Sequence, residues 1–439
     1  MRAIRLAWAL LVPGVAVAQE PVRAGLGQPV AEVTLDEAIR LADRVQPQVV
    51  QARAGIVQAN AQRRAVKGSW LPSLNATSTG GYIYSESPRT DPITGEFVTA
   101  GSETKTVNMG LTTNWELFTG FRRGADRKAA DAQLRAADAG LLDVQYQQRF
   151  QTTQQFFTAL AAREITAVRE ASVRRAEEQL KAAVVRLRAG SATRSDSLRS
   201  LVTLGTARVN LASAEADQVA AEAALGRVVG VDGRVRAVDD SAFYKVAVEA
   251  DTAALLAAAS ANSPAVLAAE AQAEQARAQL GSVKAQYWPT LTLNGQWTYN
   301  GNDQRDYELF NQRQANINLS WPLFNRFVRE RNVDNQKAQI SIAEAGAADA
   351  RRQVQSDLLG QLAQLEASRF RIEVAQQSLT ASQEDLRVVA ERYRLGVATL
   401  VDLLVSQEAL TQAELDMVSA RFSYLQARAQ IEALIGRAL

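Results

Sequence analysis

The stretch 66–74 of the chain reads VKGSWLPSL, and 217 residues later, at 283–291, the chain reads VKAQYWPTL. A second pair, WELF at 115–118 and WPLF at 321–324, is separated by 206 residues. Similarity within one chain at a fixed spacing indicates a duplicated supersecondary unit, which determines how every other segment is interpreted. We therefore expect a fold built from two copies of one unit.

A third pair, RAGSAT at 188–193 and RLGVAT at 394–399, is also separated by 206 residues. The spacing falls by 11 residues between the first pair and the other two. One polar loop, near 85–104, is therefore predicted to be longer than its counterpart near 301–312.

The two copies are predicted to span 34–230 and 251–436, joined by a linker or equatorial segment at 231–250 that has no clear periodicity. Residues 1–18 have the features of a secretory signal peptide: two arginines, an apolar run, and small residues before the expected cleavage site. Without this segment the chain has 47 basic and 47 acidic residues. Its net charge is then near zero, so no nucleic-acid partner is implied.

The composition excludes most kinds of enzyme. The chain has no histidine and no cysteine, which removes imidazole acid–base chemistry, thiol nucleophiles and most transition-metal sites. It also lacks the Gly-x-x-x-x-Gly-Lys phosphate loop and the Gly-x-Ser-x-Gly nucleophile elbow. We therefore expect a protein that is not an enzyme and that has no cofactor or metal site.

Four segments alternate apolar and polar residues, which is the signal for β-strands. They lie at about 73–84, 105–118, 290–300 and 314–324. Strands of about 10 residues match a tilted membrane span, and their face of Asn, Gln, Thr and Ser suits a water-filled lumen. The aromatic residues in these strands are predicted to lie at the membrane interfaces, namely Tyr82, Tyr84, Trp115, Trp297, Tyr299 and Trp321.

A sheet inside a membrane has to close on itself, because backbone amides in lipid need hydrogen-bond partners. Four strands are too few, since the smallest membrane barrels have about eight. Several chains are therefore expected to contribute strands to one barrel. A soluble two-sheet sandwich at the end of a helical rod is the alternative, and amphipathic strands alone do not exclude it.

Very long helices are predicted elsewhere, because no proline occurs in 122–188 or 324–439. A helix of about 65 residues would be about 100 Å long. Large and small residues alternate at heptad spacing near the C-terminus, for example at Leu403, Ser406 and Leu410, which is typical of closely packed coiled coils. The predicted fold class is mainly α with a small β part, in which long coiled-coil-like helices form a duplicated helix–hairpin–helix unit.

The helical hairpins are predicted to turn at tips near 188–196 and 394–402. Gly190 and Gly396 suit the left-handed position that follows a helix. Thr193 with Asp196, and likewise Thr399 with Asp402, has the spacing of a capping box at the start of the next helix. Hairpin structure alone accounts for these residues, so their pattern does not require a further function.

The duplication, the proline-broken first helices, the strand pairs and the Arg-x-Gly-x-x-Thr-x-x-Asp tips together resemble the outer membrane efflux protein family, the TolC-like outer membrane factors. The resemblance covers about residues 35–436. It implies a homotrimer with a 12-stranded transmembrane β-barrel and a periplasmic α-helical tunnel. It also implies a place in the outer membrane of a Gram-negative bacterium, in contact with outer-membrane lipid.

In function, the resemblance implies the passive exit duct of a tripartite efflux or secretion system. The implied partners are a periplasmic adaptor (a membrane fusion protein) and an inner-membrane transporter of the RND, ABC or MFS type. In the family the adaptor docks on the tips, which implicates Gly190, Thr193, Gly396 and Thr399. The cargo stays open among drugs, proteins and metals.

The resemblance also implies a periplasmic gate. Asp402 matches an aspartate at the family's periplasmic constriction, where three copies would form an acidic ring that favours cations. Tyr393 and Asp196 match positions that tie neighbouring helices together in the closed state. The family can carry a second constriction acid one turn further on, but this chain has Val405 there.

A second class of function is a periplasmic coiled-coil adaptor or scaffold protein. It would explain the heptads and the signal peptide. It would not explain four strands that each have one apolar and one polar face.

Overall fold

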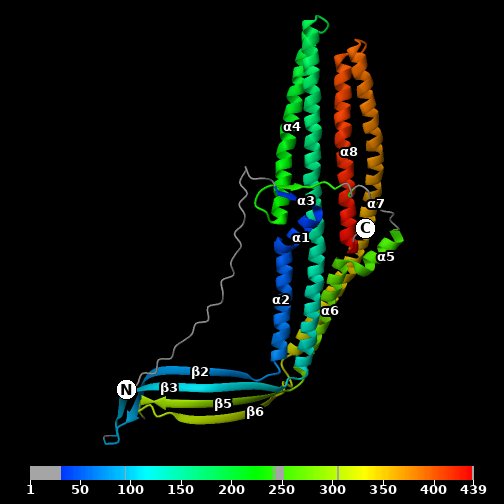
Figure 1. The fold of residues 1–439 in the computed structure, drawn as a ribbon. Helices are drawn as coiled ribbons and strands as arrows, with labels where there is room; N and C mark the ends of the chain where they lie inside the picture. Colours follow the sequence, from blue (N-terminus) through cyan, green and yellow to red (C-terminus); the bar gives the residue numbers. More distant parts are fainter. Residues whose placement is uncertain (1–30, 94, 241–242, 244–251, 304–305, 438–439) are drawn as a thin grey trace. The chain divides into compact units, whose positions relative to one another are not determined.

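The computed structural model describes residues 31–93, 95–240, 243, 252–303 and 306–437. The expected signal peptide lies outside these residues, as does most of the second half of the expected linker. The described chain forms two compact units, and each is assembled from segments that are distant in sequence (Figure 1). Unit 1 contains residues up to Gln46, Gln148–Ala247 and Gln364–Ala429, and unit 2 contains Pro47–Gln147, Val248–Ala363 and Gln430–Leu439.

The long helices of the two repeats have identical lengths. Helices α3 (Arg122–Arg188) and α7 (Val328–Arg394) have 67 residues each, and α4 (Arg194–Val229) and α8 (Leu400–Ile435) have 36 each. In unit 1, α3 lies beside α4 and α7 lies beside α8 (Figure 1). The prediction of a mainly α fold with very long helices and a small β part is confirmed.

Each repeat starts with two shorter helices that are divided by a proline. These are α1 (Leu35–Val45) and α2 (Pro47–Gly68), and then α5 (Thr252–Asn262) and α6 (Pro264–Lys284), which is followed by the short 3₁₀ helix η2 (Ala285–Tyr287). Proline suits the first position of α2 and α6, because its φ is already helical and its missing N–H needs no partner there.

By length and hydropathy, one described stretch, Thr252–Tyr287, could cross a membrane. Its charged side chains argue for an aqueous setting instead, because they form ion pairs with neighbouring helices of unit 2. Glu274 pairs with Arg135 at 2.6 Å, and Arg277 pairs with Glu344 at 2.7 Å. These pairs hold α6 against α3 on one side and α7 on the other.

Unit 2 contains a four-stranded antiparallel sheet in the order β2-β3-β5-β6 (Figure 1). The strands are β2 (Ser73–Thr90), β3 (Phe97–Phe118), β5 (Thr290–Asn302) and β6 (Phe310–Ser320). The segment near 85–104, which we expected to be a loop, is instead paired as far as Thr90 and Phe97. Alternation could not reveal it because both of its faces are polar. Strand β6 begins four residues earlier than predicted.

The core of unit 1 lies where its helices meet a second, two-stranded sheet. This parallel pair, β1 (Ala31–Val33) and β4 (Val235–Ala237), was not predicted, and β4 lies within the expected linker. Phe156 and Phe157 are buried beside it and contact the ring of Phe243 edge-on. Side chains from α1, α3, α4 and α8 complete this cluster.

Where β3 meets α3, the chain turns through two residues with positive φ, Gly120 (63°) and Phe121 (68°). A Cβ on Gly120 would lie 2.6 Å from the Cβ of Trp288 and 2.9 Å from the carbonyl oxygen of Ala285. The equivalent residue of the second repeat is Arg326, at a φ of 56°, so the conformation itself admits a side chain. Close approach to η2 and to Trp288 directly after it is therefore what requires glycine at position 120.

We predict that Gly120→Ala destabilises the junction of unit 2 by about 2 kcal/mol or more, because the added methyl group overlaps atoms that are fixed to the backbone. The matched control is Gly124→Ala, where a Cβ meets nothing within 4 Å. Denaturant unfolding of the purified protein in detergent measures both. Equal midpoints for the two variants would show that the close approach has no energetic consequence.

Candidate functional site

The two helical hairpins of unit 1 end in the same turn. After α3, Gly190 has a φ of 74°, and the N–H of Ser191 donates to the carbonyl of Arg186 at 2.9 Å. After α7, Gly396 has a φ of 79° and the corresponding bond is 2.8 Å long. This is the Schellman arrangement, in which a left-handed residue satisfies the last carbonyls of a helix.

Each tip continues into a capping box. The amide of Thr193 donates to the Asp196 carboxylate at 3.0 Å, and the amide of Asp196 donates to the Thr193 hydroxyl at 3.2 Å. Thr399 and Asp402 make the same pair of bonds at 2.9 and 3.2 Å. Each carboxylate also accepts a hydrogen bond of 2.8 Å from the threonine hydroxyl. The bonds that the carboxylates accept, first from the threonine amide and then from its hydroxyl, lower the pKa of both Asp196 and Asp402. The capping contribution is therefore present at neutral pH and is lost only as the pH falls through the lowered pKa values.

Tyr393 lies against an arginine that the sequence reading did not single out. The Arg186 guanidinium sits 4.2 Å from the centre of the Tyr393 ring. Its Nη2 also donates to the carbonyls of Tyr393 and Arg394, at 2.9 and 3.1 Å. One cation from α3 therefore caps the C-terminus of α7 and covers its last aromatic ring. The expected link between Tyr393 and Asp196 is not among the contacts that the structure describes in one protomer.

A groove of about 520 Å³ adjoins this contact, between α3, α7 and α8 of unit 1. Arg175, on its α3 side, holds Glu414 of α8 through two hydrogen bonds of 3.2 and 2.8 Å, and it donates a third to Thr411. Gln179 is 7% exposed, and its Nε2 has no partner among the described residues. The two hairpins are thus tied to each other by arginines of α3 at two levels.

In unit 2, the register of the sheet sorts its side chains onto two faces. On one face, Leu111 is level with Trp297, and Leu293 is level with Trp115 on one side and Ile317 on the other. The opposite face carries polar side chains across all four strands: Asn75, Thr77, Asn108, Thr112, Asn114, Thr292, Asn294, Gln296, Thr298, Gln314, Asn316 and Asn318. Such a sheet can face lipid on one side and water on the other.

Five of the six predicted interface aromatics lie at different heights on the apolar face, and the sixth, Trp321, directly follows β6. Trp115 is near the helix end of the sheet, and Tyr82 pairs with Lys105, ten residues further along β3. That separation is about 33 Å along the strand, or about 25 Å across a sheet tilted by 40°, which is the height of a barrel's apolar band. Tyr84 lies beyond Tyr82. Trp297 is level with Leu111, between these two heights.

Tyr299 is two residues beyond Trp297 on β5, and their rings are 5.7 Å apart. Trp115 and Trp321 have a further role at the end of the sheet. Their indole N–H groups donate to the backbone carbonyls of Trp70 and Tyr287, at 3.2 and 3.3 Å.

Two arginines extend this arrangement. Arg123 lies 5.3 Å from the ring of Trp70, and Arg329 lies 4.8 Å from the ring of Tyr287. The two arginines are 206 residues apart, and they are the second residues of α3 and α7. The sequence reading missed them, although the repeat spacing that linked the tips also links these positions.

No resident metal site is apparent among the residues that the structure describes, since no three acidic side chains converge there. The described tips and sheet present polar and apolar surfaces. Docking, pore lining and membrane contact are the activities that such surfaces support.

A family model described as "Outer membrane efflux protein" matches residues 38–231 and 255–437. Outer membrane efflux protein BepC of Brucella suis is 25% identical over 420 residues, which cover 93% of this chain and 88% of the relative. Pyoverdine export outer membrane protein OpmQ of Pseudomonas aeruginosa is 25% identical over 397 residues, covering 88% and 81%.

The crystal structure of the outer membrane protein VceC from Vibrio cholerae has the same fold, with a TM-score of 0.72 over 92% of this chain and 96% of that one, at 17% identity. The family match covers nearly all of both repeats and leaves out residues 232–254, which include almost the whole linker, and the two ends of the chain. The chain therefore belongs to the outer membrane efflux protein family: it is an efflux channel of the Gram-negative outer membrane that extends across the periplasm, and it is not an enzyme.

Proposed function

We propose that three copies of this chain form the exit duct of a tripartite export system, coupled through a periplasmic adaptor to an inner-membrane transporter. The sheet of unit 2 is the observation that carries the proposal. Within the described residues β2 and β6 pair on one side only, so each presents a free row of N–H and C=O groups. In lipid each such group costs several kcal/mol, and only pairing with another chain removes that cost.

Four strands per chain make the strand count a multiple of four. Two copies reach the minimum of about eight strands, and three give the twelve that the family resemblance implies. The apolar face of the sheet would then contact outer-membrane lipid. Its Asn, Gln and Thr face would line a wet pore, which is the property that favours a channel over a periplasmic adaptor.

Unit 1 supports assembly independently. Its helix α4 exposes Leu198, Val202 and Val209 to the extent of 53%, 68% and 70%, and α7 exposes Phe370 to 66%. Water-exposed apolar side chains in a row along a helix mark a surface that another chain covers. We assign these faces to contacts between protomers of the tunnel.

The tips are the proposed docking points for the adaptor, at Gly190 and Thr193 and at Gly396 and Thr399. Around the second tip, Leu395 and Val397 are 63% and 67% exposed, which offers an apolar contact beside the turn. The first tip presents Ala189 and Ser191 instead. The second tip is therefore the better candidate for hydrophobic docking.

The periplasmic gate is proposed to involve Asp402, Tyr393 and Asp196. Three Asp402 carboxylates around one axis would attract cations, and the lowered pKa keeps each of them charged. The contact of Arg186 with Tyr393 adds a tie between the two hairpins of one protomer. Opening the tips would require that tie to shift or break.

Covalent trapping tests the closed barrel, because the chain has no cysteine of its own. We predict that Thr77→Cys in β2 combined with Asn316→Cys in β6 gives, with a flexible bismaleimide, a ladder that ends at three linked chains. Each single-cysteine variant is the control and should stay uncrosslinked, because the two edges differ. A ladder that ends at two chains or continues beyond three would rule out a closed ring of three.

The gate prediction separates the two proposed ties. Arg186→Ala should shift the open–closed equilibrium about tenfold towards open, because it removes two charged hydrogen bonds and a ring contact. Tyr393→Phe keeps the ring and should change little if Arg186 is the main tie, but should open the channel if the hydroxyl binds Asp196. Single-channel conductance in planar bilayers is the measurement.

Arg188→Ala, which changes an exposed arginine two residues away, is the matched control for Arg186→Ala. Asp402→Asn keeps a side chain that can cap α8 but removes its charge, so cation selectivity should fall. Conductance and selectivity that are the same in all of these variants as in the wild type would exclude these residues from the gate.

A further inference from the structure

We propose that a cavity at the junction of the sheet and the helices of unit 2 binds a phospholipid with an anionic headgroup from the inner leaflet of the outer membrane. The cavity has a volume of about 810 Å³ and lies between the start of α3 and the end of α6. This inference rests on the proposed function, because it requires the apolar face of the sheet to contact lipid.

Small residues make the cavity. Gly124 and Ala125 of α3 face Ala278 and Gly281 of α6 across it. A Cβ on Gly281 would already touch that of Ala125 at 3.1 Å, whereas a Cβ on Gly124 would meet nothing within 4 Å. The helices therefore approach closely at one level and leave open space at Gly124.

The end of the cavity nearest the sheet is aromatic. Phe121 and Trp288 line it, with their rings 5.4 Å apart and edge-on. Phe121 makes the same contact with Phe118, again at 5.4 Å. Phe118 pairs with Leu291 on the apolar face of the sheet, so the aromatic rings continue the proposed lipid-facing surface into the cavity.

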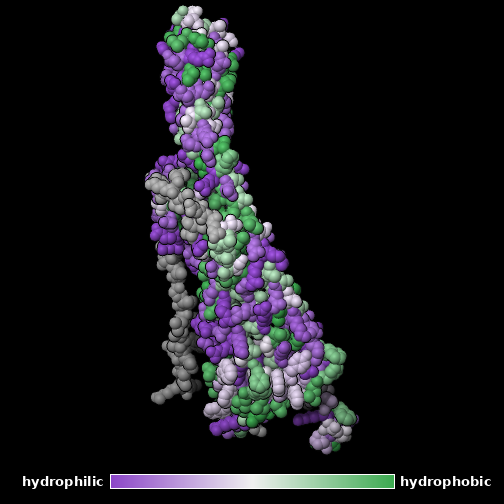
Figure 2. All heavy atoms as spheres, turned by 90° about the vertical axis from the view of Figure 1, so that its right-hand side faces the viewer, coloured by the Kyte–Doolittle hydropathy of each residue, from purple (hydrophilic) through white to green (hydrophobic). Residues whose placement is uncertain are grey.

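The surroundings of this end are also hydrophobic. Figure 2 shows hydrophobic side chains gathered at the lower end of the molecule, below the hydrophilic surface of the helices. The exposed apolar residues at the junction are Trp70, Leu71, Phe121, Trp288, Trp321, Leu323, Phe324 and Phe327. Side chains of this kind beside a barrel are expected at the level where acyl chains meet headgroups.

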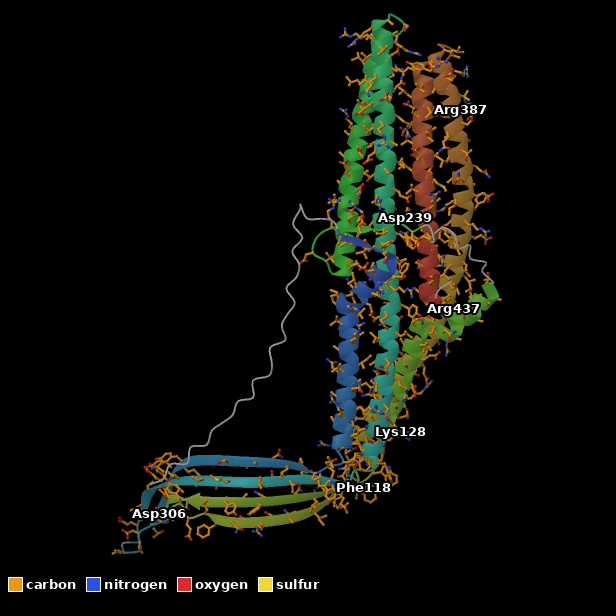
Figure 3. All side chains as sticks on the ribbon, viewed as in Figure 1. Phe118, Lys128, Asp239, Asp306, Arg387 and Arg437 are labelled. Atoms are coloured by element: carbon orange, nitrogen blue, oxygen red, sulfur yellow. The ribbon has the colours of Figure 1, made fainter. Side chains whose placement is uncertain are left out.

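Two lysines line the cavity next to its aromatic end. Figure 3 shows Phe118 at the junction and Lys128 further along α3. Lys128 lies seven residues beyond Phe121, which is about 10 Å along the helix. Lys284, the last residue of α6 and four residues before Trp288, lines the cavity from the facing side. The cavity thus has a hydrophobic end beside the sheet, with a lysine from each of the two helices next to it.

The cavity's carboxylates do not neutralise these lysines. Asp131 is paired with Arg63 at 2.7 Å, and Glu274 is paired with Arg135 at 2.6 Å. Within the described chain, the ammonium groups of Lys128 and Lys284 have neither a hydrogen bond nor an ion pair. Two unpartnered cations next to the rings of Phe121 and Trp288 suit a phospholipid, because the lysines can bind its phosphate and the rings can contact its acyl chain.

The equivalent elements, α7 in place of α3 and α2 in place of α6, lack this combination. The residue equivalent to Lys128 is Asp334, which is paired with Lys337 at 3.3 Å, and the residue equivalent to Gly124 is Glu330. Lys67 is the equivalent of Lys284 but does not line the cavity. The site therefore depends on what differs between the repeats rather than on the duplicated framework.

Native mass spectrometry of the mature protein, released from phosphatidylcholine nanodiscs with or without phosphatidylglycerol, counts the retained lipids. We expect about one retained phosphatidylglycerol per chain and a preference over phosphatidylcholine. The double variant Lys128→Gln/Lys284→Gln should weaken retention about fivefold per lysine, or roughly 25-fold in total. Gly124→Leu should abolish it by filling the cavity, and Lys67→Gln is the control that should retain lipid as the wild type does.

Equal retention of the two lipids, or wild-type retention by the double variant, would overturn the site. Displacement of the lipid by soluble glycerophosphoglycerol would also overturn it, since that result would show an anion site without a lipid component. Conductance of the same preparations separates the two proposals. Channels without selective lipid retention would overturn only the lipid site, whereas a wild type that forms no channel would overturn the proposed duct and this site with it.

Discussion

The need to pair the backbone N–H and C=O groups at the edges of the sheet constrains the rest of this structure. In water the edges of β2 and β6 could bind solvent, but the same edges are costly in a membrane. A larger sheet within one chain would have solved the problem in another way. The described part of this chain instead carries too few strands for closure, and it has exposed apolar helix faces in unit 1 that are suited to assembly.

Duplication provides the framework, and departures from it provide individual sites. The tip turns, capping boxes, tryptophan hydrogen bonds and stacked arginines recur in both halves with nearly the same geometry. In contrast, Arg186 meets Tyr393, whose own equivalent in the first repeat is Leu187. The cavity at Lys128 likewise lies between the repeats, with α3 of the first on one side and α6 of the second on the other. These contacts have no counterpart at the equivalent positions of the duplicated framework, and such contacts are natural places for function to concentrate.

Much of the fold could be predicted because its signals are local. Proline-free runs, glycine and threonine at the tips, and alternation in the strands each depend on a few neighbouring residues. The far half of the β2–β3 hairpin was missed because its side chains are polar on both faces. The pairing of Ala31–Val33 with Val235–Ala237 was missed because three-residue strands about 200 positions apart leave no periodic pattern.

The residues of the candidate site also divide into those that a local pattern revealed and those that only packing brings together. The residues of the tips were found because capping and turn chemistry act within six positions of one another. Arg186, Arg123 and the lysines of the cavity were not found, because their partners come from other helices and only packing brings them together. The expected role of Trp297 depended on its height on the sheet, which the register determines and the alternation does not.

The equal lengths of the paired helices also constrain how such a protein can evolve. Because α3 and α7 match at 67 residues and α4 and α8 match at 36, an insertion in any one of them would put its tip out of step with the other three helices. The length of the helical hairpins can therefore change only if all four helices gain or lose residues together, most simply as whole heptads. Single insertions and deletions should accumulate instead in the hairpin turns of the sheet, where the two repeats already differ.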